Sequence, residues 1–365
     1  MREVVVLGAG LHRYGVDPDK SATDMGTEAV RNALMDAGLR WDDIEAVYCG
    51  TGGQGTWGAG HLIGRVMGLT GLAITNVENA SASGSAAFRE AVLSVAAGAH
   101  DTAMAIGVDT TPPKAVNRPS TSPPLGPVNI FAMMAKQHME KYGTTRDQLA
   151  MVAVKSHYNA SFNPYAHFQE AVTLEEVHQA RMVADPLTVL HCCPWDGGGA
   201  AAIVCARELA GKYTEKICPT VVSSVLKSTL AGGDPMVDLT EFSAKIAYEQ
   251  AGAGPEDMDL IEIHDAFTIE EIIYYEALGL CEEGEGGRLI EEGVTALDGK
   301  HPVNSSGGLI SMGHPIGPTG VGQVAEILWQ MRGECGKRQI ARPVNLAMAH
   351  MVGAGGVCVI HLFRK

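Results

Sequence analysis

Basic residues are few in this chain of 365 residues, which has 27 lysines and arginines against 42 aspartates and glutamates. The formal net charge is −15. Such an acidic surface argues against nucleic acid or an anionic membrane as the main partner. It stays compatible with a small acidic ligand, because a pocket can be locally rich in amide donors. No apolar run approaches the roughly 18 residues that a membrane-spanning helix needs.

The eight cysteines form no regular framework. They are scattered singly except for the pair Cys192–Cys193, and adjacent cysteines lack the spacing of a metal site. We therefore predict reduced thiols, no metal and a cytoplasmic protein. The first residues, Met1 to Gly8, favour a strand over a charged segment followed by a signal-peptide core.

Glycine is abundant, with 44 residues, many of them in short clusters between apolar runs. This pattern is typical of an α/β protein whose loops approach ligands closely. The hydrophobic fraction of 46% and the chain length suit two domains of average size.

Two parts of the chain repeat one order of elements. The first is a strand over Glu3–Gly8, a helix over Thr23–Leu39 and a strand over Ile44–Cys49. A second set follows with a strand at Pro219–Val225, a helix at Leu239–Ala251 and a strand at Leu260–His264. Each set is the length of a parallel crossover, which indicates an internal duplication.

Both parts continue with a strand, a glycine-rich loop and a helix. The first has a strand at Ala73–Glu78, the loop 79–87 and a helix to about Ala97. The second has Val303-Asn304, the loop 305–320 and a helix from about Val321 to Met331. Two helix N-termini, which favour an anion or a developing oxyanion, are therefore expected in equivalent places.

Residues 111–190 differ in character and predict a loop and helical excursion over one face. Thr111–Pro127 is expected to be an ordered loop, followed by helices at Phe131–Tyr142 and Thr145–Asn159. Thr173–Ala184 begins with a capping signal. We expect an N-terminal half formed by 1–110 and 191–215, the excursion 111–190 as a lid, and a C-terminal half formed by 216–365.

Four blocks in order resemble the thiolase superfamily, and within it the sterol-carrier-protein-2-type thiolases. They are VENASASGSAA (77–87), the stretch from HYNASFNPYAHF (157–168) to ADPLTVLHCCPWDGGGAAAIV (184–204), EIHDAFTIEE (262–271), and GHPIGPTG (313–320) followed by HMVGAGG (350–356). The resemblance covers nearly the whole chain. It implies the thiolase fold, with two similar βαβαβαββ halves giving five α-β-α-β-α layers.

The resemblance also implies Claisen chemistry on acyl-CoA, with coenzyme A as substrate or product and no covalently bound cofactor. Position 81 would take the acyl group, His314 would activate it and the incoming CoA thiol, and His350 would exchange the α-proton. His264, through a water, and His314 would form one oxyanion hole, and the amides of Ser81 and residues 352–353 another. Gly353, Gly355 and Asn304 are the expected residues of the oxyanion holes and their loops. Substrate-binding candidates are Ser306, Gly307, Met312 and Met133.

Position 81 departs from the family pattern, because Asn79-Ala80 should be followed by cysteine and is followed by Ser81. A serine hydroxyl is far less acidic than a thiol and needs a base. Three explanations are open: an engineered substitution, a natural serine nucleophile, or a reaction without an acyl-enzyme. The alternatives to a thiolase are therefore an aldolase acting on a 3-hydroxyacyl-CoA and a non-catalytic acyl-CoA-binding subunit.

Partners follow from the same resemblance. We expect a homodimer or a dimer of dimers, and a heteromeric complex with a separate zinc-ribbon/OB-fold subunit is compatible. The acyl group, of lipid β-oxidation or aromatic degradation, and the direction of reaction stay open.

Overall fold

The computed structural model of the protein describes residues 1–52, 56–110 and 126–365. A nine-stranded sheet has the order β3-β2-β4-β7-β1-β8-β11-β10-β9, and β5 and β6 form a separate pair. The strands are β1 (Val4–Gly15), β2 (Ala46–Gly50), β3 (Ala73–Val77), β4 (Thr102–Asp109), β5 (Met182–Ala184), β6 (Leu187–Thr188), β7 (Gly197–Ala206), β8 (Thr220–Ser228), β9 (Leu260–Glu262), β10 (Leu346–Gly353) and β11 (Val357–Arg364).

The large sheet consists of two similar sets of strands joined edge to edge. In the first set β2 is parallel to β3 and β4, and β7 is antiparallel to β4 and β1. In the second set β9 is parallel to β10, and β11 is antiparallel to β10 and β8. The predicted strand at Val303-Asn304 is wrong in extent, because only a parallel bridge between Val303 and Ile261 takes the place that β3 has in the first set. Val5 of β1 pairs with Thr220 of β8 at the join.

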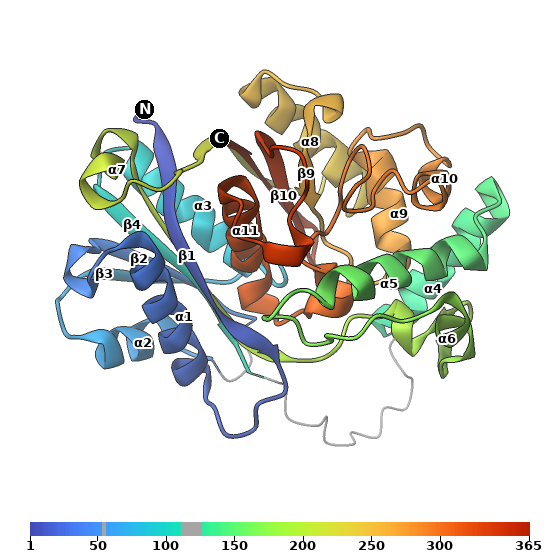
Figure 1. Ribbon diagram of the computed structural model, residues 1–365, viewed down its shortest axis with the longest axis horizontal. Helices are drawn as coiled ribbons and strands as arrows, with labels where there is room; N and C mark the ends of the chain where they lie inside the picture. Colours follow the sequence, from blue (N-terminus) through green and yellow to red (C-terminus); the bar gives the residue numbers. More distant parts are fainter. Residues whose placement is uncertain (53–55, 111–125) are drawn as a thin grey trace.

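Helices form three layers around the two sets of strands, which gives the α-β-α-β-α arrangement (Figure 1). α1 and α2 cover the outer face of the first set, α8 and α9 that of the second, and α3 and α11 lie between the sets. The helices are α1 (Ala22–Ala37), α2 (Ala59–Met67), α3 (Ser83–Ala96), α4 (Pro127–Tyr142), α5 (Arg146–Ala160), α6 (Leu174–Gln179), α7 (Arg207–Tyr213), α8 (Val237–Ala251), α9 (Thr268–Ala277), α10 (Gly286–Glu291) and α11 (Ile316–Arg332).

Alternate residues of β1 point into two different hydrophobic cores. Val5 and Leu7 pack in the cluster that contains α1, whereas Val4 and Val6 pack in the cluster that contains α3 and α11. This alternation follows from the two-residue period of a strand. The central helices are therefore buried between the two sets of strands, which explains why α11 is buried nearly all round.

α11 begins at Ile316, five residues before the predicted start at Val321. The glycines and the proline of 313–320 favoured a loop, but Pro318 lies in the first turn, where its missing N–H is not needed. The glycines serve close packing instead. A Cβ on Gly84 of α3 would lie 2.2 Å from the carbonyl oxygen of Gly317, so the two helices approach backbone to backbone.

The excursion contains α4, α5 and α6, and the last two begin with complete capping boxes at Thr145 and Thr173. The predicted segment Thr173–Ala184 is helical only to Gln179, and its last residues form β5. Of the predicted ordered loop at 111–127, residues 111–125 lie outside the described residues. Within the described ranges, no helix is long and apolar enough to cross a membrane.

Candidate active site

Ser81 stands in a tight turn between β3 and α3. The preceding residue, Ala80, has a φ of 48°, a left-handed conformation that alanine rarely adopts. Such strain costs roughly 1–3 kcal/mol and collects at functional sites. Ser83 orders the turn, because its hydroxyl accepts from Asn79 N at 2.8 Å and donates to Ala80 O at 2.6 Å. The turn leaves the Ser81 side chain part-buried, two residues before α3 begins.

His314 is the base nearest to that hydroxyl, with Nε2 3.1 Å from Ser81 Oγ. Its tautomer is fixed by Thr319, whose hydroxyl proton is already donated to Pro315 O at 2.7 Å. Nδ1 of His314, 2.9 Å from Thr319 Oγ1, must therefore carry the hydrogen. The neutral ring then presents its lone pair at Nε2 to Ser81. Burial, with His264 nearby, lowers the pKa of His314 well below its usual range.

Ser81 and His314 occupy equivalent places in the two halves. Ser81 lies two residues before α3, and His314 lies two residues before α11. The helices start side by side, so a hydroxyl and an imidazole meet where two helix dipoles present their positive ends. Asp196 anchors the second of these turns by accepting from His314 N at 3.1 Å.

His264 follows the end of β9 and faces the same place. Its ring centroid is 5.3 Å from that of His314, and the rings are perpendicular. Glu270 Oε1 lies 3.1 Å from His264 Nδ1, and Glu270 Oε2 accepts from Phe267 N at 3.0 Å. Nε2 of His264 is buried and has no protein partner in the described part of the chain. This nitrogen is the one that can meet a water or a ligand.

His350 lies in the middle of β10 and is fully buried. Its Nε2 is 3.0 Å from Thr240 Oγ1, and its ring is 4.7 Å from that of Tyr274. Nδ1 has no partner among the residues that the structure describes. Burial, and to a smaller extent His264, lowers the pKa of His350 to about 3. The ring is therefore neutral at physiological pH and can accept a proton.

The three predicted oxyanion and loop residues differ in their surroundings. Gly353 is at the site, because a Cβ there would lie 2.3 Å from the carbonyl oxygen of Asn79. Gly355 has a φ of 92° and open space around it. The side chain of Asn304 is committed to the protein, with Oδ1 accepting from Ile263 N and Nδ2 donating to Glu271. These bonds tie Asn304 to the loop, and its part in an oxyanion hole stays a prediction.

The predicted substrate-binding residues are spread more widely. Ser306 is buried and donates to Glu262, and Gly307 packs against the backbone of Ala160. Met312 is 6% exposed and belongs to the core cluster that contains Tyr14. Met133 is half exposed on α4. The role of these four residues in substrate binding stays a prediction.

Three residues that position the histidines were not found from the sequence: Thr319, Glu270 and Asp196. Glu270 carried a signal, since it stands three residues after Phe267 and completes a capping arrangement at the start of α9. Nothing in the sequence marked Thr319 or Asp196 as a positioning residue beyond their place in two of the blocks that resemble the family. Burial raises the pKa of Asp196 to about 6, and the neighbouring His167 opposes that rise.

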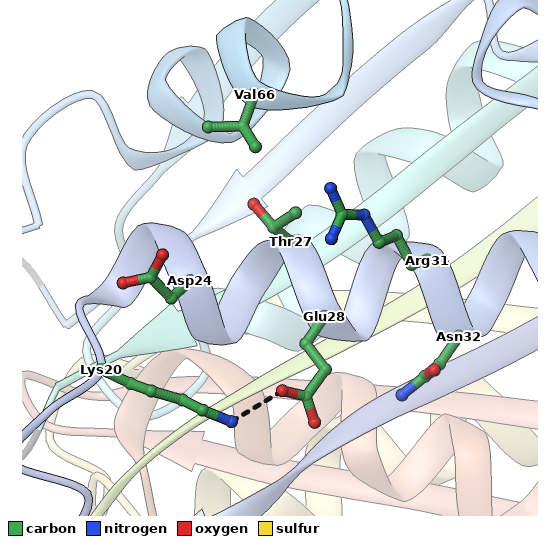
Figure 2. Close-up of a pocket in the computed structure, with 7 residues that line it drawn as sticks. All are labelled: Lys20, Asp24, Thr27, Glu28, Arg31, Asn32 and Val66. Carbon is green, nitrogen blue, oxygen red and sulfur yellow. Dashed lines mark hydrogen bonds and ion pairs between the residues drawn. The ribbon is translucent and has the colours of Figure 1, made fainter.

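A separate cavity of about 310 Å³ lies between α1 and α2, on the outer side of the first half (Figure 2). Its lining includes Lys20 and Glu28, which form an ion pair at 2.8 Å, and Arg31. None of the site histidines lines it. Across the described ranges, no group of three or more His, Cys, Asp or Glu side chains could hold a metal ion.

Comparison with known proteins decides the family. Residues 5–121 match the thiolase N-terminal domain and residues 226–361 the thiolase C-terminal domain-like family. An acetyl-CoA acetyltransferase of Methanothermobacter thermautotrophicus is 42% identical over 100% of both chains. The chain belongs to the thiolase family. Benzoylsuccinyl-CoA thiolase subunit BbsB of Thauera aromatica, another similar protein, is 35% identical over 97% of this chain and 95% of its own.

Solved structures show the same thiolase fold. The chain superimposes on the Ltp2-ChsH2(DUF35) aldolase with a TM-score of 0.86 and 22% identity, covering 98% of this chain and 97% of that one. For human mitochondrial 3-ketoacyl-CoA thiolase the TM-score is 0.76 and the identity 16%, covering 100% and 99%. At these identities the likeness concerns the fold.

Proposed function

We propose that this thiolase-family protein is an acyl-CoA C-acyltransferase that cleaves or forms a 3-oxoacyl-CoA, with Ser81 as acyl acceptor. The observation that carries the proposal is the contact of 3.1 Å between Ser81 Oγ and the lone-pair nitrogen of His314. A hydroxyl needs such a base because its own pKa is far above neutral. Relatives named acetyl-CoA acetyltransferase and thiolase support the same reaction class.

In the cleavage direction, Ser81 Oγ bonds to C3 of the 3-oxoacyl group and its proton passes to His314 Nε2. The C2–C3 bond breaks, and its electron pair stays on C2 as the enolate of acetyl-CoA. His314 gives up the proton it took from Ser81, and that proton passes by way of His350 to C2, so acetyl-CoA leaves and His314 is neutral again. The thiol of CoA then attacks the Ser81 ester, its proton returns to Ser81 Oγ through His314, and an acyl-CoA one acetyl unit shorter leaves.

His350 and His264 serve the enolate. In the condensation direction, neutral His350 removes a C2 proton from acetyl-CoA, and in cleavage it relays to C2 the proton that His314 took from Ser81. Its low pKa keeps it available as a base at neutral pH. Glu270 holds the His264 ring through Nδ1. Nε2 of His264 then accepts a hydrogen bond from a water, and this water donates its other hydrogen to the thioester oxygen.

A thiolysis assay on wild type, Ser81→Cys and Ser81→Ala tests the proposal, with acetoacetyl-CoA and bulkier 3-oxoacyl-CoAs as substrates and intact-mass measurement for an acyl adduct. We expect the wild type to turn over and carry an adduct of one acyl group, and Ser81→Ala to do neither. Ser81→Cys, whose thiolate is the stronger nucleophile, should be faster. Ser83→Ala controls for disturbance of the turn.

A retro-aldol cleavage of a 3-hydroxyacyl-CoA is the second candidate, because it needs no acyl acceptor and Ser81 is a weak one. This reaction would proceed equally in Ser81→Ala and would not consume CoA. Full activity of Ser81→Ala with 3-hydroxyacyl-CoA, and none of any form with 3-oxoacyl-CoA, would replace our proposal.

The proposal also assigns a role to each part of the chain. We assign residues 1–110 with 191–215, and 216–365, to the two halves that build the site, and 111–190 to the cover that selects the acyl group. Coenzyme A is the second substrate, in line with relatives whose structures contain it. We further propose a cytoplasmic homodimer or dimer of dimers. A separate zinc-ribbon/OB-fold subunit is supported by a relative named as a subunit and by the composite Ltp2-ChsH2(DUF35) aldolase.

A further inference from the structure

A buried group of two glutamates lies beneath the site and takes no part in the chemistry above. Glu262, the last residue of β9, and Glu326, on α11, are each 1% exposed. Between them lies the hydroxyl of Ser305, 2.9 Å from Glu262 Oε1 and 3.0 Å from Glu326 Oε1. Two buried carboxyl groups therefore share one hydroxyl.

The proton count of this group is constrained. A serine hydroxyl has one hydrogen and makes one full donated bond. Its contact with the second carboxyl oxygen is then a hydrogen bond when that carboxyl carries a proton, and a repulsive contact when it does not. Buried polar atoms are rarely left in repulsive contacts, because each costs the desolvation of the group.

Glu326 is the ionised member. Arg338 donates to it through Nε at 3.1 and 3.0 Å, and Nη2 lies 3.0 Å from Oε2. Gln330 Nε2 donates to the same carboxylate at 3.0 Å. Glu262 contacts no cation within the described residues. The proton therefore belongs to Glu262, which donates to Ser305, while Ser305 donates to Glu326.

Glu262 also holds the next residue of the loop. Its Oε2 accepts from Ser306 Oγ at 2.5 Å and its Oε1 from Ser306 N at 3.1 Å. Gly308 N donates in turn to Ser306 Oγ at 3.1 Å. These bonds tie the end of β9, which leads to His264, to the start of the loop that leads to His314.

We propose that Glu262 is a neutral carboxylic acid that fixes the strand of His264 to the loop of His314, and that it is a positioning residue of the site. Its part in catalysis rests on the proposed function, whereas its protonation and its hold on the loop do not. When Glu262 loses its proton, two buried carboxylates repel across Ser305 and the loop loses its anchor.

The surroundings of Glu262 favour this state. The ionisable groups that face it are Glu326, Arg338 and Cys335, whose Sγ lies 3.7 Å from Glu326 Oε1. Burial, and then the charge of Glu326, raises the pKa of Glu262 to about 7, while the bonds from Ser306 and Ser305 oppose the rise. The proton is therefore lost within the range in which the protein is assayed.

Two measurements that do not depend on turnover test the anchor. The first is the infrared band of protonated carboxyl groups in wild type minus Glu262→Gln, recorded at pH 5 to 9. The second is hydrogen exchange of the 304–312 peptide, corrected for the intrinsic effect of pH. We expect a band that disappears near pH 7, and corrected exchange that rises over the same range in wild type but not in Glu262→Gln.

The third measurement is the pH dependence of kcat. Wild type should lose activity on the alkaline side as the band disappears, and Glu262→Gln, neutral at every pH, should keep its rate there. Glu276→Gln is the control, because this largely buried glutamate pairs with His138 and does not contact the loop. It should leave the pH profile of the wild type unchanged.

Each result decides a separate point. No difference band means that Glu262 is ionised and overturns the proposal. A band with no pH-dependent exchange shows that the acid does not hold the loop, and equal alkaline limbs in both proteins overturn the positioning role. If no thioester reacts at all, the proposed function fails while the infrared and exchange results still stand. If Glu262→Gln does not fold, Ser306→Ala replaces it and should raise loop exchange already at pH 5.

Discussion

Gly353 lies against Asn79, so that a Cβ on the glycine would be 2.3 Å from the asparagine carbonyl oxygen. The turn between β10 and β11 thus packs directly against the turn that carries Ser81, although the two turns are far apart in the sequence. The contact leaves no room for a side chain.

We predict that Gly353→Ala displaces the Ser81 turn. Overpacking of this kind costs typically about 1–3 kcal/mol of stability, and the displacement should lower kcat more than it raises KM. Steady-state kinetics and urea unfolding measure the two effects. Gly211→Ala, in helix α7 with nothing within 4 Å of the new Cβ, should leave kcat unchanged and should not lower the stability, because alanine is the better helix former. A normal kcat in Gly353→Ala would show that the turn can yield without moving Ser81.

Thr319→Val should free the His314 ring while keeping the shape of the side chain. Without the hydroxyl, Nδ1 has lost the acceptor that fixes the tautomer, and the lone pair at Nε2 is no longer assured. General-base catalysis contributes typically 10²–10⁴-fold, so we expect kcat to fall by about 10–100-fold. Thr319→Ser, which keeps the hydroxyl, should recover most of the rate. If the serine variant is as slow as the valine variant, packing and not the tautomer explains the loss.

Glu270→Gln should disturb His264 without touching His314. The amide can replace only one of the two acceptor oxygens, so either His264 Nδ1 or Phe267 N loses its partner. We expect a fall in kcat of about 10-fold, since one hydrogen bond to a charged group is worth ~1.5–3 kcal/mol and half of that would be retained. The Ser81 adduct in the intact-mass experiment should form about 10-fold more slowly, because the enolate that His264 stabilises forms in the step that makes the adduct. An unchanged rate of adduct formation would mean that Glu270 acts in the second half-reaction instead.

Acid should destabilise the protein through its buried histidines, and His191 offers a clean test. Its Nδ1 accepts from Thr188 N at 3.1 Å, so the folded protein requires the neutral ring. Burial lowers its pKa to about 4, below the ordinary value of 6.5. Between these values the unfolded chain binds the proton and the folded one does not. Stability is therefore present above pH 6.5 and falls as the pH drops toward 4, by at most ~1.4 kcal/mol per unit for one group.

His191→Asn should flatten that fall, because the asparagine oxygen can accept from Thr188 N and does not titrate. Urea unfolding at pH 4.5, 5.5, 6.5 and 7.5 gives the comparison. His61→Asn, at an exposed histidine of α2, is the matched substitution and should follow the wild type. Parallel curves for wild type and His191→Asn would mean that the ring is protonated in the folded state.

The fold was predictable from the sequence where the chain repeats itself. The apolar periods of 3–49 and 219–264 mark the two α/β units, and the structure pairs their strands in the same pattern. The start of α11 was not predictable from local preference, because Gly317 and Gly320 disfavour a helix. Their positions are set by contacts with Gly84 and Ser85 of α3, which no local rule contains.

The side chains proposed to carry out the reaction were predictable from the sequence. Ser81, His264 and His314 stand in blocks that resemble the family, and the structure brings the rings of the two histidines to 5.3 Å. The residues that position these side chains were not predictable. Thr319 and Glu270 look like ordinary helix residues, and their roles come from the histidines that they contact in the folded protein. Hydrogen bonding between distant segments is a property of the folded chain, and the sequence alone shows only that such residues are present.

The equivalence of Ser81 and His314 has a consequence for how such a site can arise. Two separate identical halves would place the same residue before both central helices, and a pair of hydroxyls or a pair of imidazoles cannot divide the work of nucleophile and base. Joining the halves in one chain breaks this symmetry, because each position can then change alone. The acid at the end of β9 and the strained turn before α3 likewise belong to different halves, so the proposed site draws on features that each half has separately.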